Sequence, residues 1–145
     1  MRFTRYAFYQ PMEEILLMEW GAPMKILAFA ASNSSVSINK KQVTYAVGLL
    51  NGVESEVLDL NDYEMPLFSQ DREHHLGSPR QAVDFMAKIA TADALITSFA
   101  EHNRSYSAAY KNLFDWCSRI QQNVFQDKPI VYISTSPAPV ARVLC

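Results

Sequence analysis

Three features of the 145-residue sequence predict an α/β fold with a doubly wound parallel sheet and helices on both of its faces, in three layers. From residue 24 onward, short apolar runs alternate with segments of helical periodicity. The runs are continuously apolar, which is typical of strands buried on both faces. Hydrophobic residues form 49% of the chain and charged residues 19%, a balance that excludes a disordered chain and suits one domain.

The first strand and the first helix lie on either side of a polar loop. KILAFA at residues 25–30 predicts the strand, and serines dominate the loop at 32–37. Residues 39–50 predict a helix, because apolar side chains recur at i, i+3, i+4 and i+7. These apolar side chains are Val43, Ala46, Val47 and Leu50.

The next segment predicts a strand, a long loop and a second helix. EVLDL at residues 56–60 reads as a short strand, and 61–78 is rich in Pro, Asp, His and Gly, as surface loops are. Pro79 suits the first position of a helix that runs to about Thr91. The side chains expected to face inward are Val83, Met86, Ile89 and Ala90.

The remaining elements complete a β-α-β-α-β-α-β order. DALITSF at residues 93–99 predicts a third strand, and IVYIS at Ile130–Ser134 a fourth. Between them, a long helix is expected to begin near Ser107. Its inward positions are expected to be Ala109, Leu113, Trp116, Cys117 and Ile120.

Charge and cysteine content restrict the environment and the partners. Thirteen Lys and Arg against fifteen Asp and Glu give a net charge of −2, without the basic excess of a nucleic-acid surface. Two cysteines, Cys117 and Cys145, make a disulfide framework improbable and favour a reducing, cytoplasmic location. No run approaches the ~18 apolar residues of a membrane helix.

Residues 1–23 are expected to be a poorly ordered extension of a domain that spans 24–145. Glu13 and Glu14 interrupt any apolar core of a signal peptide, and a second methionine, Met24, directly precedes the first strand.

A ligand is expected at the carboxyl edge of this sheet, where the loops at 31–38, 100–106 and 135–140 would meet. The first loop offers short hydroxyl and amide side chains and leads into a helix N-terminus, an arrangement that favours an anion such as phosphate. It contains neither a Walker pattern nor a glycine-rich dinucleotide fingerprint. A serine-rich turn, with Ser37 or Asn39 as a plain helix cap, remains an equal alternative.

Two stretches of the chain resemble the NADPH-dependent FMN reductase family, a flavodoxin-like group. MKILAFAASNSSVSINKK is similar to the family's phosphate loop, G-S-x-R-x-x-S-x-N, and AEHNRSYSAAYKNLFDW is similar to P-E-Y-N-x-S-x-P-G-x-L-K-N-x-x-D-W. STSP at residues 134–137 looks like the family's third loop. In the second stretch, the residues that match in register are Glu101, Asn103, Ser105, Lys111, Asn112, Asp115 and Trp116.

The chain also departs from the family pattern. Ala31 replaces a glycine of the phosphate loop, and Ser34 replaces its arginine, a bidentate phosphate partner. In the second motif, Ala100, His102 and Ala108 replace proline, tyrosine and glycine. The family's later helix and fifth strand have no counterpart. The resemblance therefore implies four strands of a sheet that is incomplete at its C-terminal side, with the fourth strand left as an exposed edge.

The resemblance implies FMN as cofactor, NADPH or NADH as co-substrate and a small-molecule electron acceptor such as a quinone, in a homo-oligomer. It requires no protein nucleophile, acid–base pair or metal, because the flavin carries the chemistry. The residues expected to contact the cofactor are Ser32, Ser34, Ser37, Ile38, Asn39, Ala100, Glu101, His102, Asn103, Ser105, Ser134, Thr135 and Ser136.

Several conspicuous residues are better explained by structure than by chemistry. The adjacent His74 and His75 lack the spacing of a metal site. Cys117 is expected to be a buried, inert thiol, and Trp116 to pack in the core or at a subunit interface. Lys111 and Asp115 are spaced to pair along a helix. Lys40 and Lys41 could attract a phosphate or simply form a solvated helix face.

Two other functions remain open. The chain could be a non-catalytic flavodoxin-like remnant or interaction domain with weak or no flavin binding. It could also be a flavodoxin-type electron carrier, although a net charge of −2 is small for such a carrier.

Overall fold

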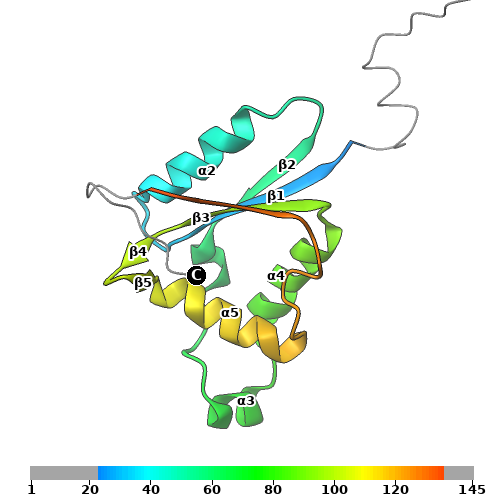
Figure 1. Ribbon diagram of the computed structural model, residues 1–145. Coiled ribbons are helices and arrows are strands. Elements are labelled where there is room, and N and C mark those ends of the chain that lie inside the picture. The colour runs from blue at the N-terminus through cyan, green and yellow to red at the C-terminus, as the bar shows by residue number, and fades with distance from the viewer. Residues whose placement is uncertain (1–22, 136–145) are drawn as a thin grey trace, which may run out of the picture.

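The computed structural model describes residues 23–135, which form a four-stranded parallel sheet with helices on both faces and a small two-stranded antiparallel sheet (Figure 1). The elements, in chain order, are β1 (Lys25–Ala31), α2 (Ile38–Gly48), β2 (Glu54–Leu58), the 3-10 helix η1 (Leu60–Tyr63), α3 (Gln70–Leu76), α4 (Arg80–Thr91), β3 (Ala94–Phe99), β4 (Glu101–His102), β5 (Ser105–Tyr106), α5 (Ala108–Ile120) and β6 (Ile130–Ser134). The expected residues 1–23 extension lies almost wholly outside the described residues.

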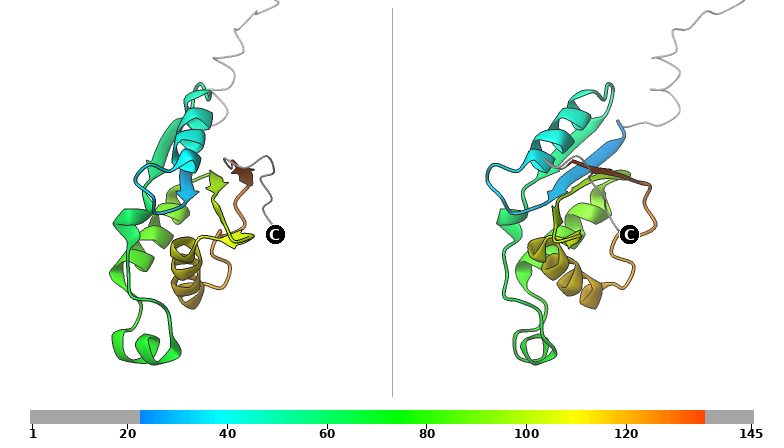
Figure 2. Two further views of the ribbon diagram at one scale, coloured as in Figure 1. Left: turned by 90° about the vertical axis from the view of Figure 1, so that its left-hand side faces the viewer. Right: turned by 60° about the vertical axis from the view of Figure 1, so that its left-hand side comes forward.

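The main sheet has the order β2-β1-β3-β6, and all its pairs are parallel. Helix α2 covers one face, and α4 and α5 cover the other, so the layers are those of the predicted flavodoxin-like fold (Figures 1 and 2). Because all four strands run the same way, the ends of β1, β3 and β6 lie at one edge.

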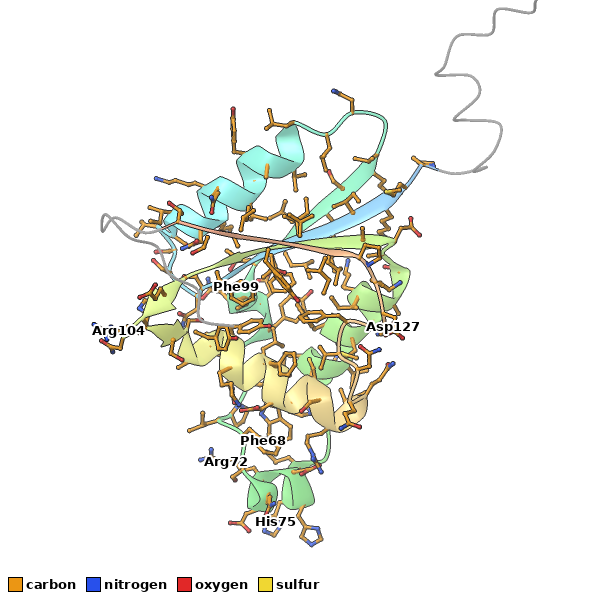
Figure 3. The ribbon with its side chains drawn as sticks, in the orientation of Figure 1. Phe68, Arg72, His75, Phe99, Arg104 and Asp127 are labelled. Carbon is orange, nitrogen blue, oxygen red and sulfur yellow. The ribbon has the colours of Figure 1, made fainter. Side chains whose placement is uncertain are left out.

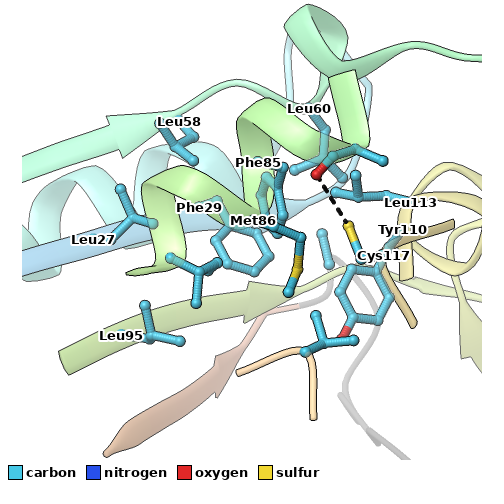
Figure 4. Packing of buried hydrophobic residues seen from close by; sticks show 14 of the residues in the cluster. Leu27, Phe29, Leu58, Leu60, Phe85, Met86, Leu95, Tyr110, Leu113 and Cys117 are labelled. Atoms are coloured by element: carbon cyan, nitrogen blue, oxygen red, sulfur yellow. Dashed lines mark hydrogen bonds between the residues drawn. The ribbon is translucent and has the colours of Figure 1, made fainter. Parts of the chain in front are cut away.

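The two faces of β1 explain the unequal layers. Leu27 and Phe29 point into the larger core, where Phe29 meets Phe85 edge-on at 5.4 Å between ring centroids (Figure 4). The small side chains of Ala28 and Ala30 point the other way and pack with Val43 and Val47 of α2. Alanines on this face allow the α2 backbone to approach the sheet closely.

The buried face of α4 agrees with the prediction at Met86 and Ile89 but not at Val83 and Ala90. Its buried side chains are Ala82, Phe85, Met86 and Ile89, whereas Val83 and Ala90 are exposed. The large Phe85 ring decides the orientation because it packs edge-on against both Phe29 and Tyr63. In α5 Tyr110 is likewise buried, whereas Ile120 is exposed.

The prediction of a loop at 61–78 is wrong, because this segment contains most of η1 and all of α3. Asp59 accepts a hydrogen bond from the Asn61 N–H and so starts η1, which explains why β2 ends at Leu58. Ser69 caps α3 by accepting from the Arg72 N–H. The α3 segment projects away from the sheet at the bottom of Figure 1.

Strand β6 lies at the edge of the described sheet and pairs with β3 there. Val131 and Tyr132 are 56% and 52% exposed, in agreement with the expectation of an exposed strand. Separately, no helix within residues 23–135 has the length and apolar character needed to cross a membrane.

Candidate functional site

Three segments meet at the carboxyl edge of the sheet, on the left in Figure 1. They are the loop between β1 and α2, the β4–β5 hairpin after β3, and the end of β6. This is the edge at which ligands bind in open α/β sheets. The predicted site residues that the structure describes therefore come from one side of the molecule.

The loop from Ser32 to Ser37 presents hydrogen-bond donors to solvent. Ser37 is the N-cap of α2, and its hydroxyl accepts from the Lys40 N–H at 3.2 Å. Within residues 23–135 the backbone N–H groups of Val36, Ile38 and Asn39 have no hydrogen-bond partner. Free N–H groups at the positive end of a helix form a binding site for an anion.

The serines of this loop differ in accessibility. Ser32 is buried and its hydroxyl accepts from the Ser34 N–H, which holds the turn. Ser34 and Ser35 are exposed, and in the described chain their hydroxyls form no hydrogen bond. A phosphate at the start of α2 could therefore receive hydroxyl as well as backbone donors.

Lys40 pairs with Asp59, the residue that follows β2. The hydrogen bond from Lys40 and that from the Asn61 N–H hold the pKa of Asp59 below its usual range. The ion pair keeps an ammonium group beside the first turn of α2 but balances its charge. Lys41 is exposed. The two lysines, for which the sequence offered the same two interpretations, therefore differ in the structure, since Lys40 forms an ion pair with Asp59.

Asn39 points its side chain inward and not toward solvent. It is 3% exposed, and its amide bonds to the backbone of Thr135 and to the Ser98 hydroxyl. The predicted residue is thus at the site, but its side chain joins the first loop to the third.

The β4–β5 hairpin forms the second part of the site. Asn103 and Arg104 both have positive φ, 53° and 65°, as a two-residue type I′ turn requires. His102 and Ser105 are exposed on the paired strands, and Arg104 projects at the tip (Figure 3). The predicted loop at 100–106 is therefore a hairpin of two short strands.

Two side-chain hydrogen bonds connect the ends of the strands next to the hairpin. Ala100 is buried, and Ser107 donates its hydroxyl to the Ala31 carbonyl at 2.8 Å while capping α5. Ser107 thus ties the end of β1 to the start of α5. Ser134 donates similarly from β6 to the Phe99 carbonyl at 3.1 Å. These contacts hold the ends of β1, β3 and β6 in fixed relation.

Two polar residues at this edge were missed by sequence reasoning, Ser98 and Gln42. Ser98 is fully buried, and its hydroxyl lies 2.9 Å from both the Asn39 and Gln42 amide oxygens. A polar pair, Thr97–Ser98, inside the apolar third strand was the available signal. Ser136 lies outside the described residues.

Cys117, Trp116 and Lys111 have the structural roles that the sequence predicts. Cys117 is buried, and burial raises the pKa of its thiol to about 12. Trp116 is buried and donates to the Pro66 carbonyl at 2.8 Å. Lys111 pairs with Asp115. His74 and His75 lie at the end of α3, and residues 23–135 contain no group of three potential metal-binding side chains.

A parallel sheet of order β2-β1-β3-β6, with free N–H groups at a helix N-terminus on its carboxyl edge, defines a flavodoxin-like α/β fold. The chain belongs to the NADPH-dependent FMN reductase family, whose pattern matches residues 24–143. This match confirms the family resemblance.

Individual relatives agree with the family. An NAD(P)H-dependent FMN reductase of Pseudomonas aeruginosa is 32% identical over 114 residues, covering 78% of this chain and 60% of the relative. An NADPH:quinone oxidoreductase of Arabidopsis thaliana is 32% identical over 116 residues, covering 77% and 58%. This chain thus spans less than two thirds of the length of these relatives.

Comparison with solved structures also finds a flavoenzyme. The structure of FerB, a flavoenzyme NAD(P)H:(acceptor) oxidoreductase from Paracoccus denitrificans, superposes with a TM-score of 0.66 at 28% identity. The match covers 80% of this chain and 63% of FerB. The residues present here fit an FMN phosphate by the chemistry of their donors, since residues 32–39 offer free N–H and hydroxyl groups and contain no carboxylate.

Proposed function

We propose that this protein is an NAD(P)H-dependent FMN oxidoreductase that reduces a quinone, a flavin or a similar small acceptor. The observation that carries the proposal is the set of free donors at the start of α2, namely the Val36, Ile38 and Asn39 N–H groups. When bound, FMN would accept hydride from NAD(P)H and pass electrons to the acceptor. The protein's residues would bind the flavin, orient it and shield it from water.

Each segment has a distinct part in this proposal. The loop from Ser32 to Asn39 would hold the phosphate. The hairpin from Ala100 to Ser105 would lie along the flavin ring, with Glu101, His102 and Asn103 at the contact. Ser134, Thr135 and Ser136 would border the ring from the third loop. His102 is planar and exposed, and so can stack in the place of the family's tyrosine.

The acceptor, the assembly and the location are part of the same proposal. Relatives named quinone oxidoreductases support a small-molecule acceptor. Exposed apolar side chains, including Leu67 and Leu76 around α3, are compatible with a homodimer. A single buried thiol in the described chain suits the reducing cytoplasm.

Titration with FMN and with FAD, followed by flavin fluorescence, tests the cofactor. FMN should bind more tightly, because the site offers donors for one terminal phosphate. Ser37→Ala should weaken FMN binding by about tenfold through loss of the α2 cap. Ser69→Ala is the matched control, since Ser69 caps α3 in the same way at the far end of the molecule.

The control separates binding from stability. Both substitutions should lower the free energy of unfolding by about 1 kcal/mol, but Ser69→Ala should leave the FMN affinity unchanged. NADPH oxidation with a quinone acceptor then tests the activity. Tighter binding of FAD, or equal affinity in Ser37→Ala and the unmodified protein, would contradict the proposed site.

A further inference from the structure

The side-chain amide of Asn39 forms hydrogen bonds with both the backbone N–H and the backbone carbonyl of Thr135, at the opposite end of the described chain. The Thr135 N–H donates to Asn39 Oδ1 at 3.2 Å, and Asn39 Nδ2 donates to the Thr135 carbonyl at 3.3 Å. These two bonds imitate one step of strand pairing. They connect the first turn of α2 with the residue that follows β6, 96 positions away.

Ser98 and Gln42 extend this pairing into a network. Ser98 Oγ lies 2.9 Å from Asn39 Oδ1 and 2.9 Å from Gln42 Oε1, and Gln42 Nε2 donates to the Ser134 carbonyl at 3.3 Å. Two consecutive peptides at the end of β6 are therefore held by side chains of α2. The buried Ser98 hydroxyl, on β3, lies within hydrogen-bonding distance of both amide oxygens and can donate its single proton to either of them.

The bonding capacity of Asn39 is almost fully used inside the protein. Its oxygen accepts two hydrogen bonds and one of its two N–H groups donates, while the whole residue is 3% exposed. Turning the side chain toward a phosphate would break these bonds and leave buried polar groups unpaired. The exposed Ser34 and Ser35 hydroxyls carry no such cost.

We propose that Asn39 is a positioning residue that locks the end of β6 to the start of α2 and does not bind the flavin phosphate through its side chain. The inference rests on the proposed function for the identity of the ligand, but the lock itself exists without one. Its effect is to hold the first and third loops at a fixed separation before the ligand arrives. A preformed site loses less conformational entropy on binding.

The first test measures hydrogen exchange of the Thr135 amide by NMR in the ligand-free, full-length protein. Asn39→Ala should accelerate this exchange by about tenfold or more, because it removes the acceptor of the Thr135 N–H. Ser98→Ala keeps that acceptor but loses the hydroxyl that orients it, so a smaller acceleration is expected. If Asn39→Ala folds poorly, the Ser98→Ala variant provides the test in its place.

The matched control is Asn112→Ala. Asn112 also bridges backbone groups, accepting from the Phe68 N–H at 2.8 Å and donating to the Met65 carbonyl at 3.1 Å, but it belongs to α5. Its loss should leave Thr135 exchange unchanged. Unchanged Thr135 exchange in Asn39→Ala would overturn the proposal.

The second test compares FMN with riboflavin, which lacks the phosphate. A positioning residue affects the whole flavin site, so Asn39→Ala should weaken both ligands by a similar factor, about tenfold. If FMN affinity falls while riboflavin affinity is unchanged, Asn39 is a phosphate ligand and the proposal fails. If the unmodified protein binds neither flavin, the proposed function fails, and the exchange measurement still decides the role of Asn39.

Discussion

The Thr97 hydroxyl is fully buried and, within residues 23–135, is the buried side-chain polar atom without a hydrogen-bond partner. It lies on the core face of β3, between Leu95 and Phe99 along the strand. An unpaired buried hydroxyl costs free energy, because it gives up water and receives nothing in return.

Thr97→Val should therefore raise the free energy of unfolding, by about 1 kcal/mol, since valine has the same shape without the hydroxyl. Urea denaturation followed by circular dichroism measures the change. Thr44→Val is the control, because the Thr44 hydroxyl is exposed and donates to the Lys40 carbonyl. A loss of stability in Thr97→Val would mean that the hydroxyl is satisfied.

Cys117 should be unreactive in the folded protein. Burial raises the pKa of its thiol from 9.0 to about 12, so almost no thiolate exists at pH 8. In a Cys145→Ser variant, iodoacetamide should modify Cys117 at pH 8 only after denaturation. Between pH 9 and 12 the unfolded chain loses this proton while the folded chain keeps it, so stability should fall as the pH rises. Rapid alkylation of the native protein would contradict this burial.

At the scale of the element, the β4–β5 hairpin contains a residue poorly suited to its backbone. Arg104 has a φ of 65° at the second central position of the turn, where glycine is favoured. The position carries a side chain, whose clash in the left-handed region costs about 1–2 kcal/mol. The paired residues Glu101 and Tyr106 hold the turn in this conformation.

Arg104→Gly should stabilise the protein by about 0.5–1 kcal/mol, once the extra freedom of glycine in the unfolded chain is subtracted. The melting temperature of the variant, compared with that of the unmodified protein, shows whether the substitution stabilises or destabilises the fold. Lys41→Gly is the opposite control, because Lys41 lies in the helix α2, where glycine costs about 1 kcal/mol. Destabilisation in both variants would show that the turn is unstrained.

At the scale of the whole molecule, we propose that the domain begins at Met24. The Glu54 N–H donates to the Met24 carbonyl at 2.9 Å, so the pairing of β1 with β2 starts there. A chain that begins at Met24 should match the full chain in melting temperature and in FMN affinity. A large decrease in either would show that residues 1–23 pack against the domain. Calorimetry and flavin titration make the comparison.

Strands buried on both faces were predictable, because such burial requires a continuous run of apolar residues in the sequence. β1 and β3 have continuous apolar sequences and are buried on both faces, whereas β6 has the same kind of sequence but lies at an exposed edge. The parallel arrangement of the three strands followed from the helices between them. The orientation of α4 was not predictable, because apolar side chains occupy too many of its positions. Contact with Phe29 and Tyr63 selects the face that contains Phe85. The seven-residue helix α3 was too short for a periodic signal.

The residue types at the site were predictable from the sequence, but the directions of their side chains were not. The serines before α2 and the motif from Glu101 to Trp116 identified the family, which the comparison confirms. The direction of each side chain was not predictable. Asn39 has the residue type of a phosphate contact, and only the folded chain brings Thr135 close enough to use its amide.

By itself, the sequence determined the four strands of the main sheet, the three long helices, their order and the polar character of the loops, because these depend on short-range patterns of apolar and polar residues. It did not determine η1, α3 or the β4–β5 hairpin. The tertiary structure decided which donors remain free. Ser37, Ser98 and Asn39 are all polar, yet packing uses their side chains inside the protein and leaves the Ile38 N–H for a ligand. That division depends on contacts between residues far apart in the chain, whose energies no local pattern contains.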